Sequence, residues 1–130
     1  MTRWIWTYAA ALLTLAAMDG IWLGFVARNF YQREMVAVAA ESFRAVPAVL
    51  FYLGYPAGLL ALALHPQPAT LLEAVWRAAL VGLLAYATYD LSNMATLKQW
   101  SVQLALVDVV WGVCLSAVIG GVAYSVLRRF

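Results

Sequence analysis

Four long apolar stretches dominate the chain and restrict it to one class of fold. They extend over approximately residues 4–27, 46–64, 71–95 and 101–127. Each is close to the roughly 20 residues that a helix needs to cross the hydrocarbon core of a bilayer. Only 11% of the residues are charged, against about 25% in a soluble domain. The pattern predicts an all-α membrane protein, with a single domain over residues 1–130 that forms an antiparallel bundle of four transmembrane helices.

The connections between these helices define two sides of the bundle. Both termini and the HPQP turn that begins at His65 fall on one side, called side 1. The segment 28–45 and the short turn at Lys98 fall on the other, called side 2. Segment 28–45 mixes charged with aromatic and apolar residues, so we expect an interfacial helix lying on the membrane. Tryptophans near both sides are typical of interfacial aromatic belts, and Trp100 is expected at side 2.

The start of the chain has some features of a signal peptide, with Arg3 before an apolar run. The run continues to about Ala27, beyond the usual length of such a region, and it contains Asp19. We therefore expect it to be retained as the first membrane helix.

The glutamates and the aspartates occupy different parts of the sequence. All three glutamates lie in connections or at helix ends, whereas Asp19, Asp90 and Asp108 lie inside the expected membrane helices. With a helical rise of about 1.5 Å per residue, each aspartate lies about 12 to 15 Å from side 2. Three carboxyls from three helices therefore fall in one layer. Ionisable residues within membrane spans are costly, and they commonly mark functional sites.

Polar and aromatic side chains are expected around this layer. Asn93 and Tyr86 share the helical face of Asp90, and Tyr55 reaches nearly the same depth. The motifs DGIW (19–22) and DVVW (108–111) repeat each other, each with a tryptophan three residues after the aspartate. The predicted ligand- or cation-binding site consists of Asp19, Asp90, Asp108, Asn93, Tyr55, Trp22, Trp111 and Tyr86. Three basic residues are expected at its rim, where they would attract a lipid phosphate or another anion: Arg28, Arg33 and Lys98.

The charge of the layer needs an explanation, because three ionised carboxylates at low dielectric constant would repel one another. No basic residue lies at that depth. Three solutions stay open. Some aspartates are protonated, a cation such as Na⁺, Mg²⁺ or Ca²⁺ lies among them, or arginines of segment 28–45 such as Arg28 or Arg33 fold over them. The three aspartates would be the ligands of any such metal ion.

Motifs for common cofactors are missing. There is no CxxC, no HExxH, no glycine-rich phosphate loop and no histidine pair, so nothing indicates haem, zinc or a nucleotide. Cys114 and His65 lie at different depths, which leaves no Cys-His arrangement for nucleophilic catalysis. The sequence therefore assigns no catalytic residue, and it does not decide whether the protein is an enzyme.

Five segments carry a resemblance to a known family: DGIWLG (19–24), NFYQRE (29–34), FYLGYPAGL (51–59), YATYDLSNMATLKQW (86–100) and LVDVVWG (106–112). In this order they resemble a family of small bacterial four-helix membrane proteins catalogued as domain of unknown function 2177. The resemblance covers nearly the whole chain and implies a four-helix fold in a bacterial cytoplasmic membrane. It implies no particular activity. The family motif positions that it suggests are Asp19, Trp22, Tyr31, Tyr52, Asp90, Asn93, Lys98, Trp100, Asp108 and Trp111.

Three functions are consistent with these features. The first is a buried polar site, open toward side 2, that binds a proton or a cation together with a small polar or lipid-like ligand, for binding or transport. The second is a membrane enzyme acting on a lipid or isoprenoid, with an aspartate as general acid or base. The third is an accessory subunit of a larger membrane complex, in which the aspartates join helices by hydrogen bonds and no cavity lies beside them.

The expected partners follow from the same features. Membrane lipid is one, and a second copy of the chain or a larger membrane complex is another. A chain of this size would need to dimerise to transport, and the GxxxG spacing of Gly54 and Gly58 allows this, although packing inside the bundle is its simpler role. The net charge of +2 is small and scattered, so nothing indicates nucleic acid.

Overall fold

The computed structural model covers residues 1–130 and consists of helices joined by short connections. The elements are α1 (Thr2–Ile21), a π-helical turn η1 (Trp22–Val26), α2 (Arg28–Glu34), α3 (Ala45–Ala63), α4 (Leu71–Thr96) and α5 (Val102–Arg129). α1 together with η1, and each of α3, α4 and α5, is long and apolar enough to cross a membrane. The predicted all-α fold with four transmembrane helices is confirmed.

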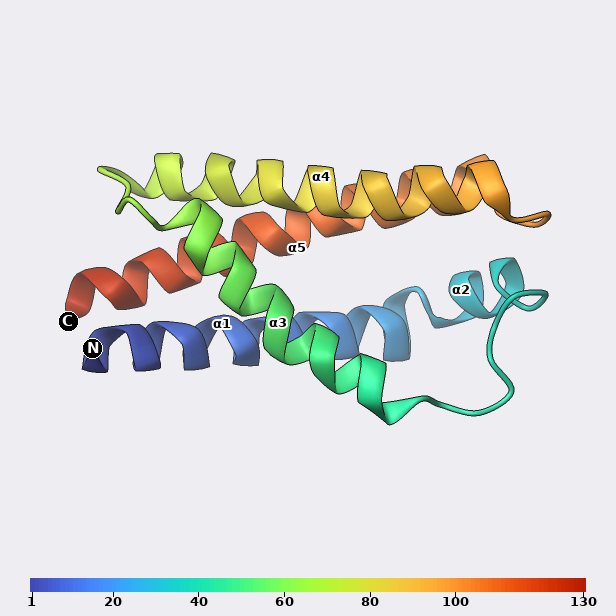
Figure 1. Cartoon of the computed structure of the whole chain (residues 1–130), viewed down its shortest axis with the longest axis horizontal. Helices are drawn as coiled ribbons and strands as arrows, with labels where there is room; N and C mark the ends of the chain where they lie inside the picture. Colours follow the sequence, from blue (N-terminus) through green and yellow to red (C-terminus); the bar gives the residue numbers. More distant parts are fainter.

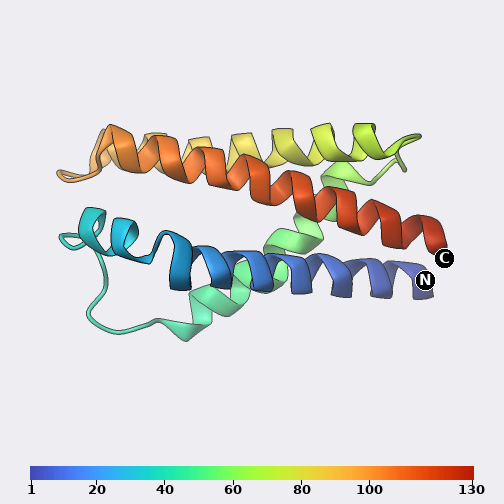
Figure 2. The same cartoon turned by 180° about the vertical axis from the view of Figure 1, so that it is seen from behind.

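The long helices form an antiparallel bundle whose two ends differ (Figure 1). α4 and α5 lie side by side over most of their length, and α1 lies beside α5 (Figures 1 and 2). α3 crosses the bundle obliquely: its last turns lie near the start of α4, and its first turns lie far from α4 (Figure 1). Both termini lie at side 1, whereas α2 and the turn between α4 and α5 lie at side 2.

Small residues allow α4 and α5 to approach closely. A Cβ atom at Gly112 would overlap the ring of Tyr86, and a Cβ atom at Gly120 would overlap Ala78. Contacts of this kind are common between membrane helices, because lipid tails provide no hydrophobic driving force and close van der Waals packing takes its place. The contact fixes the two aspartates that α4 and α5 carry relative to each other.

Apolar packing fills the half of the bundle near side 1. Its large, fully buried side chains come from α1, α5 and the end of α3, and they include Leu15, Leu59, Leu64, Leu115 and Leu127. Large apolar side chains such as Leu13, Leu50 and Leu84 are exposed on the outside, as lipid-facing positions of a membrane protein are expected to be. Toward side 2 this core ends, and the aspartates lie beyond it.

Two details of the fold differ from expectation. The connection 28–45 begins with α2, but it is helical only to Glu34 and continues as turns. Gly54 and Gly58 have no atoms within 4 Å of the place where a side chain would be, so they face outward instead of packing inside the bundle. The close small-residue contact is made by α4 and α5, because these helices run alongside each other while α3 crosses at an angle.

Candidate functional site

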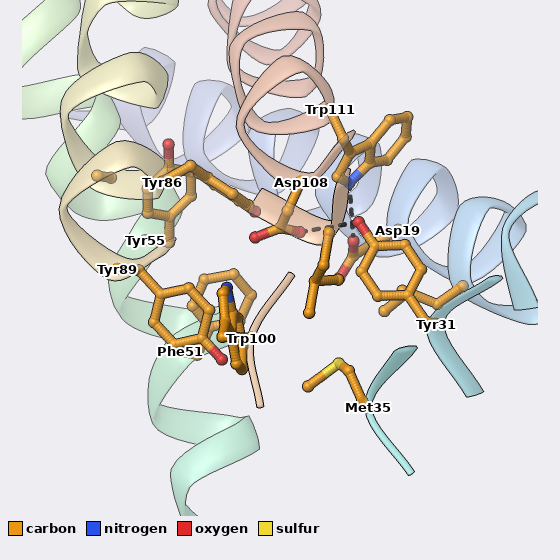
Figure 3. Close-up of a pocket in the computed structure, with 13 residues that line it drawn as sticks. Asp19, Tyr31, Met35, Phe51, Tyr55, Tyr86, Tyr89, Trp100, Asp108 and Trp111 are labelled. Atoms are coloured by element: carbon orange, nitrogen blue, oxygen red, sulfur yellow. Dashed lines mark hydrogen bonds between the residues drawn. The ribbon is translucent and has the colours of Figure 1, made fainter. Parts of the chain in front are cut away.

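The side-2 half of the bundle contains a cavity of about 510 Å³ beside the aspartates (Figure 3). This volume falls in the range of typical ligand pockets, about 300 to 1,000 Å³. Side chains from all four membrane helices, from α2 and from the turn before α5 form its wall, so it exists only in the folded bundle. The lining residues are Asp19, Asp108, Tyr31, Phe51, Tyr55, Tyr86, Tyr89, Trp100, Trp111, Leu23, Met35, Ala85 and Leu104.

Asp19 of α1 is held by two other helices. The hydroxyl of Tyr52 on α3 donates to Asp19 Oδ2 at 2.6 Å, and Nε1 of Trp111 on α5 donates to Asp19 Oδ1 at 3.3 Å. Only 7% of the residue is exposed. Both carboxyl oxygens therefore have partners, and the position of the carboxyl depends on the packing of three helices.

Asp108 of α5 is half-buried and accepts a hydrogen bond from α2. The hydroxyl of Tyr31 donates to Asp108 Oδ1 at 2.9 Å, and Trp22 Nε1 donates to the same hydroxyl at 3.3 Å. Burial raises the pKa of Tyr31 above its ordinary value, so the hydroxyl keeps its proton at neutral pH and acts as a donor. In Figure 3, Asp108 lies between Tyr31 on one side and Tyr86 on the other.

The two aspartate–tryptophan motifs of the sequence interlock. The rings of Trp22 and Trp111 are stacked, with centroids 4.4 Å apart and planes 5° from parallel. Trp111, which follows Asp108 in sequence, donates to Asp19. Trp22, which follows Asp19, reaches Asp108 through the hydroxyl of Tyr31. Each tryptophan thus supports the aspartate of the other motif, an exchange that the antiparallel contact of α1 with α5 allows.

Asp90 of α4 has a different environment. It is 0% exposed and does not line the cavity. Trp100 Nε1 donates to Asp90 Oδ1 at 3.2 Å, whereas Oδ2 has no hydrogen-bond partner. The N–H of Trp100 contacts the carboxyl of Asp90, and its ring lines the cavity. Trp100 therefore lies between Asp90 and the cavity.

The position of Trp100 corrects the expectation of an interfacial aromatic belt at side 2. Trp6 and Trp76 near side 1 are exposed, as that expectation requires, but Trp100 is only 8% exposed. Its ring packs edge-on against Tyr89, with centroids 5.6 Å apart. The turn between α4 and α5 brings it inward, where the carboxyl of Asp90 provides an acceptor for its N–H.

The other predicted site residues are distributed unevenly. Tyr55 and Tyr86 line the cavity, and the hydroxyl of Tyr55 pairs with Ser116 Oγ at 2.6 Å. Asn93 is half-buried but does not line the cavity, and Trp22 lies behind Trp111 in the stack.

The basic residues expected at the rim, Arg28, Arg33 and Lys98, are exposed and do not line the cavity. The two ion pairs of the structure are Arg33–Glu34 and Arg77–Glu73. No arginine pairs with an aspartate, so this possible source of charge balance is not used. No group of three or more acidic, histidine or cysteine side chains is close enough to hold a metal ion.

Comparison with known proteins identifies a family. Residues 4–125 match the family described as "Predicted membrane protein (DUF2177)". The chain belongs to this family. No curated protein and no solved structure matches it. The matched residues include all three aspartates and every residue that lines the cavity, so the candidate site lies within the matched part of the chain.

Several residues of the site were not predicted as members of it. Tyr31 and Trp100 are positions that the resemblance to the DUF2177 family suggests, so the family pattern contains a signal for them. Phe51, Met35 and Tyr89 carry no such signal. Their contribution depends on the oblique course of α3, on the way α2 folds back over the bundle end, and on the rotation of α4, which a single sequence does not reveal.

Proposed function

We propose that the protein binds a small amphiphilic molecule inside the membrane, with the polar head at Asp19 and Asp108 and the apolar part against the wall of the cavity. The lining of the cavity carries this proposal: two carboxyls converge in a wall whose other eleven residues are hydrophobic. A mostly apolar pocket with a few convergent polar groups is typical of ligand sites. Binding or transport across a bacterial cytoplasmic membrane would be its use. A proton would take the ligand's place at the carboxyls, because unbalanced charge is costly in such a site.

The cavity favours this function over that of an accessory subunit. Aspartates that serve only to join helices need donors but no open space beside them. Asp19 does join helices, through Tyr52 and Trp111. Asp108 differs, since its carboxyl borders the cavity and accepts a hydrogen bond at Oδ1 alone. An open cavity beside a partly unpaired carboxyl supports ligand binding.

The course of α3 supports entry of the ligand from the lipid. Toward side 2, α3 lies away from α4 (Figure 1). Ala85 and Tyr89 on α4 and Phe51 on α3 line the cavity and are also exposed. A molecule dissolved in the bilayer could therefore enter between these helices without crossing water.

Filling the cavity tests the proposal. Ala85→Trp adds an indole to the wall, whereas the matched variant Leu84→Trp adds one at the adjacent position, which faces outward and is 69% exposed. The protein in phosphatidylcholine nanodiscs would be titrated calorimetrically with tetraphenylphosphonium and with neutral triphenylphosphine oxide, against empty nanodiscs. We expect Ala85→Trp to remove binding of at least one probe and Leu84→Trp to leave it unchanged. If neither probe responds to Ala85→Trp, the cavity is not a ligand site.

A further inference from the structure

We infer that the ligand of this cavity is an organic cation, a molecule whose positive charge is surrounded by carbon, as in a substituted ammonium or phosphonium group. This inference rests on the proposed function, and it names the class of ligand. It follows from three observations: the neutral partners of the carboxyls, the nature of the wall and the position of the basic residues.

The first observation is that no positively charged side chain pairs with an aspartate inside the bundle. The aspartate oxygens accept four hydrogen bonds, and the donors are the hydroxyls of two tyrosines and the indole N–H groups of two tryptophans. All four donors are neutral. The two ion pairs of the chain involve glutamates and arginines outside the site. The protein itself therefore supplies no positive charge to balance an ionised carboxyl in the site, and a cationic ligand that displaces the proton would supply it.

The second observation is that aromatic rings form most of the wall. Seven of the thirteen lining residues are tyrosine, phenylalanine or tryptophan. An aromatic face attracts a cation by about 0.5 to 2 kcal/mol, most strongly where water is excluded. The same rings bury the carbon shell of an organic cation. Carboxyls combined with aromatic faces therefore match both parts of such a molecule.

An inorganic cation fits this site less well. Hard metal ions need several oxygen ligands at once, six to eight in the case of Ca²⁺. The three aspartates do not form a group that could hold a metal ion, and the oxygens of Asp19 are already used by Tyr52 and Trp111. An organic cation needs no such coordination shell, because its charge is spread over a larger, weakly hydrated surface.

The third observation excludes an anionic head group at the carboxyls. A lipid phosphate would need basic partners, but Arg28, Arg33 and Lys98 do not line the cavity. An anion inside would instead face Asp108 directly. The rim residues are exposed at side 2, where they would act on molecules at the membrane surface and not on the bound ligand.

Probes that share a shape but differ in charge test the inference. Tetraphenylphosphonium and tetraphenylborate are matched in size and geometry and carry opposite charges, and triphenylphosphine oxide is a smaller neutral relative. In phosphatidylcholine nanodiscs, with empty nanodiscs as reference, we expect the cation to bind most tightly and the anion not to bind. In the double variant Asp19→Asn/Asp108→Asn, affinity for the cation should fall by about thirtyfold or more, as expected when one partner of a buried charge pair is removed. Affinity for the neutral probe should change little.

The outcomes separate this inference from the proposed function. If the cation and the neutral probe bind equally, and Ala85→Trp blocks both, the cavity is a ligand site but the inference about charge is overturned. If Ala85→Trp blocks neither, both proposals fail. If the double variant does not fold, as judged by circular dichroism and gel filtration, the comparison of the three probes on the unaltered protein still decides between a cationic and an uncharged ligand.

Discussion

At the scale of residues, the three aspartates occupy three different environments, although the sequence predicts similar depths in the membrane for all of them. Asp19 has partners for both oxygens, Asp108 borders the cavity, and Asp90 is fully buried with one oxygen unpaired. A buried polar atom without a partner costs free energy. Of the three aspartates, Asp90 is therefore the one whose carboxyl group contributes least to the stability of the fold.

Two substitutions of Asp90 should distinguish the contributions of its two carboxyl oxygens to stability. In Asp90→Asn, the carbonyl oxygen can still accept from Trp100 Nε1, and a neutral amide NH2 group takes the place of the unpaired carboxyl oxygen. The free energy of unfolding should therefore change by less than about 1 kcal/mol, because one unpaired polar group replaces another. In Asp90→Leu, the buried N–H of Trp100 loses its acceptor, and we expect a loss of about 2 kcal/mol. Unfolding in mixed micelles, followed by tryptophan fluorescence, measures both. Equal losses in the two variants would contradict the assigned hydrogen bond.

At the scale of elements, α2 closes the side-2 end of the site. Tyr31 reaches Asp108 from α2, and Met35, directly after α2, lines the cavity. Glu34 accepts a hydrogen bond from the hydroxyl of Ser101, which also caps the start of α5 by accepting from Leu104 N–H. A helix of seven residues has little stability of its own, so these contacts determine where α2 lies.

The contact of α4 with α5 determines the geometry of the opposite wall, and glycine substitutions test it. Gly112→Val would force its side chain into the ring of Tyr86, so we expect a loss of about 3 kcal/mol or more, the upper range for overpacking. Gly54→Val has open space around it and should cost less than about 1 kcal/mol, with unfolding in mixed micelles as the measurement. A large loss for Gly54→Val would instead show that this outward face packs against a second chain.

At the scale of the whole molecule, the two halves of the bundle differ. Side 1 contains the dense apolar core, and side 2 contains the cavity with its carboxyls. The side-1 core thus contains no carboxyl group, and the buried carboxyls of Asp19 and Asp90 lie in the side-2 half, where hydroxyl and indole donors reach them. The dense half fixes the helices, and the open half offers room for a ligand.

The arrangement of the ends predicts a labelling pattern. In a Cys114→Ser background, single cysteines at Thr2 and Phe130 should react with a membrane-impermeant maleimide from one side of the membrane. Cysteines at Ala37 and Gln99 should react from the other side, because four membrane helices return the chain to its starting side. Labelling of Ala37→Cys and Phe130→Cys from the same side would contradict the four-span topology.

Much of the fold could be predicted from the sequence because hydrophobic length is a local property. The apolar stretches agree with the ends of the four membrane spans to within one or two residues, since Pro-rich turns and charged connections mark these ends. The sequence does not reveal that the first span changes from α-helix to a π-helical turn after Ile21. Of the residues predicted for the candidate site, Asp19, Asp108, Tyr55, Tyr86 and Trp111 line the cavity, whereas Asp90, Asn93 and Trp22 do not. The rotation of a helix about its axis decides which other side chains face inward. These helices are apolar on all sides, so their hydropathy pattern does not reveal that rotation.

The sequence by itself determined that four apolar helices cross a membrane and that three carboxyls lie inside it, because length, composition and helical rise set both. Only the tertiary structure decided how those carboxyls are partnered. It brought Trp111 to Asp19, Tyr31 to Asp108 and Trp100 to Asp90. Each of these contacts joins different elements of the chain, and side-chain partners across elements depend on helix crossing angles and on the folding of connections, which no local pattern specifies.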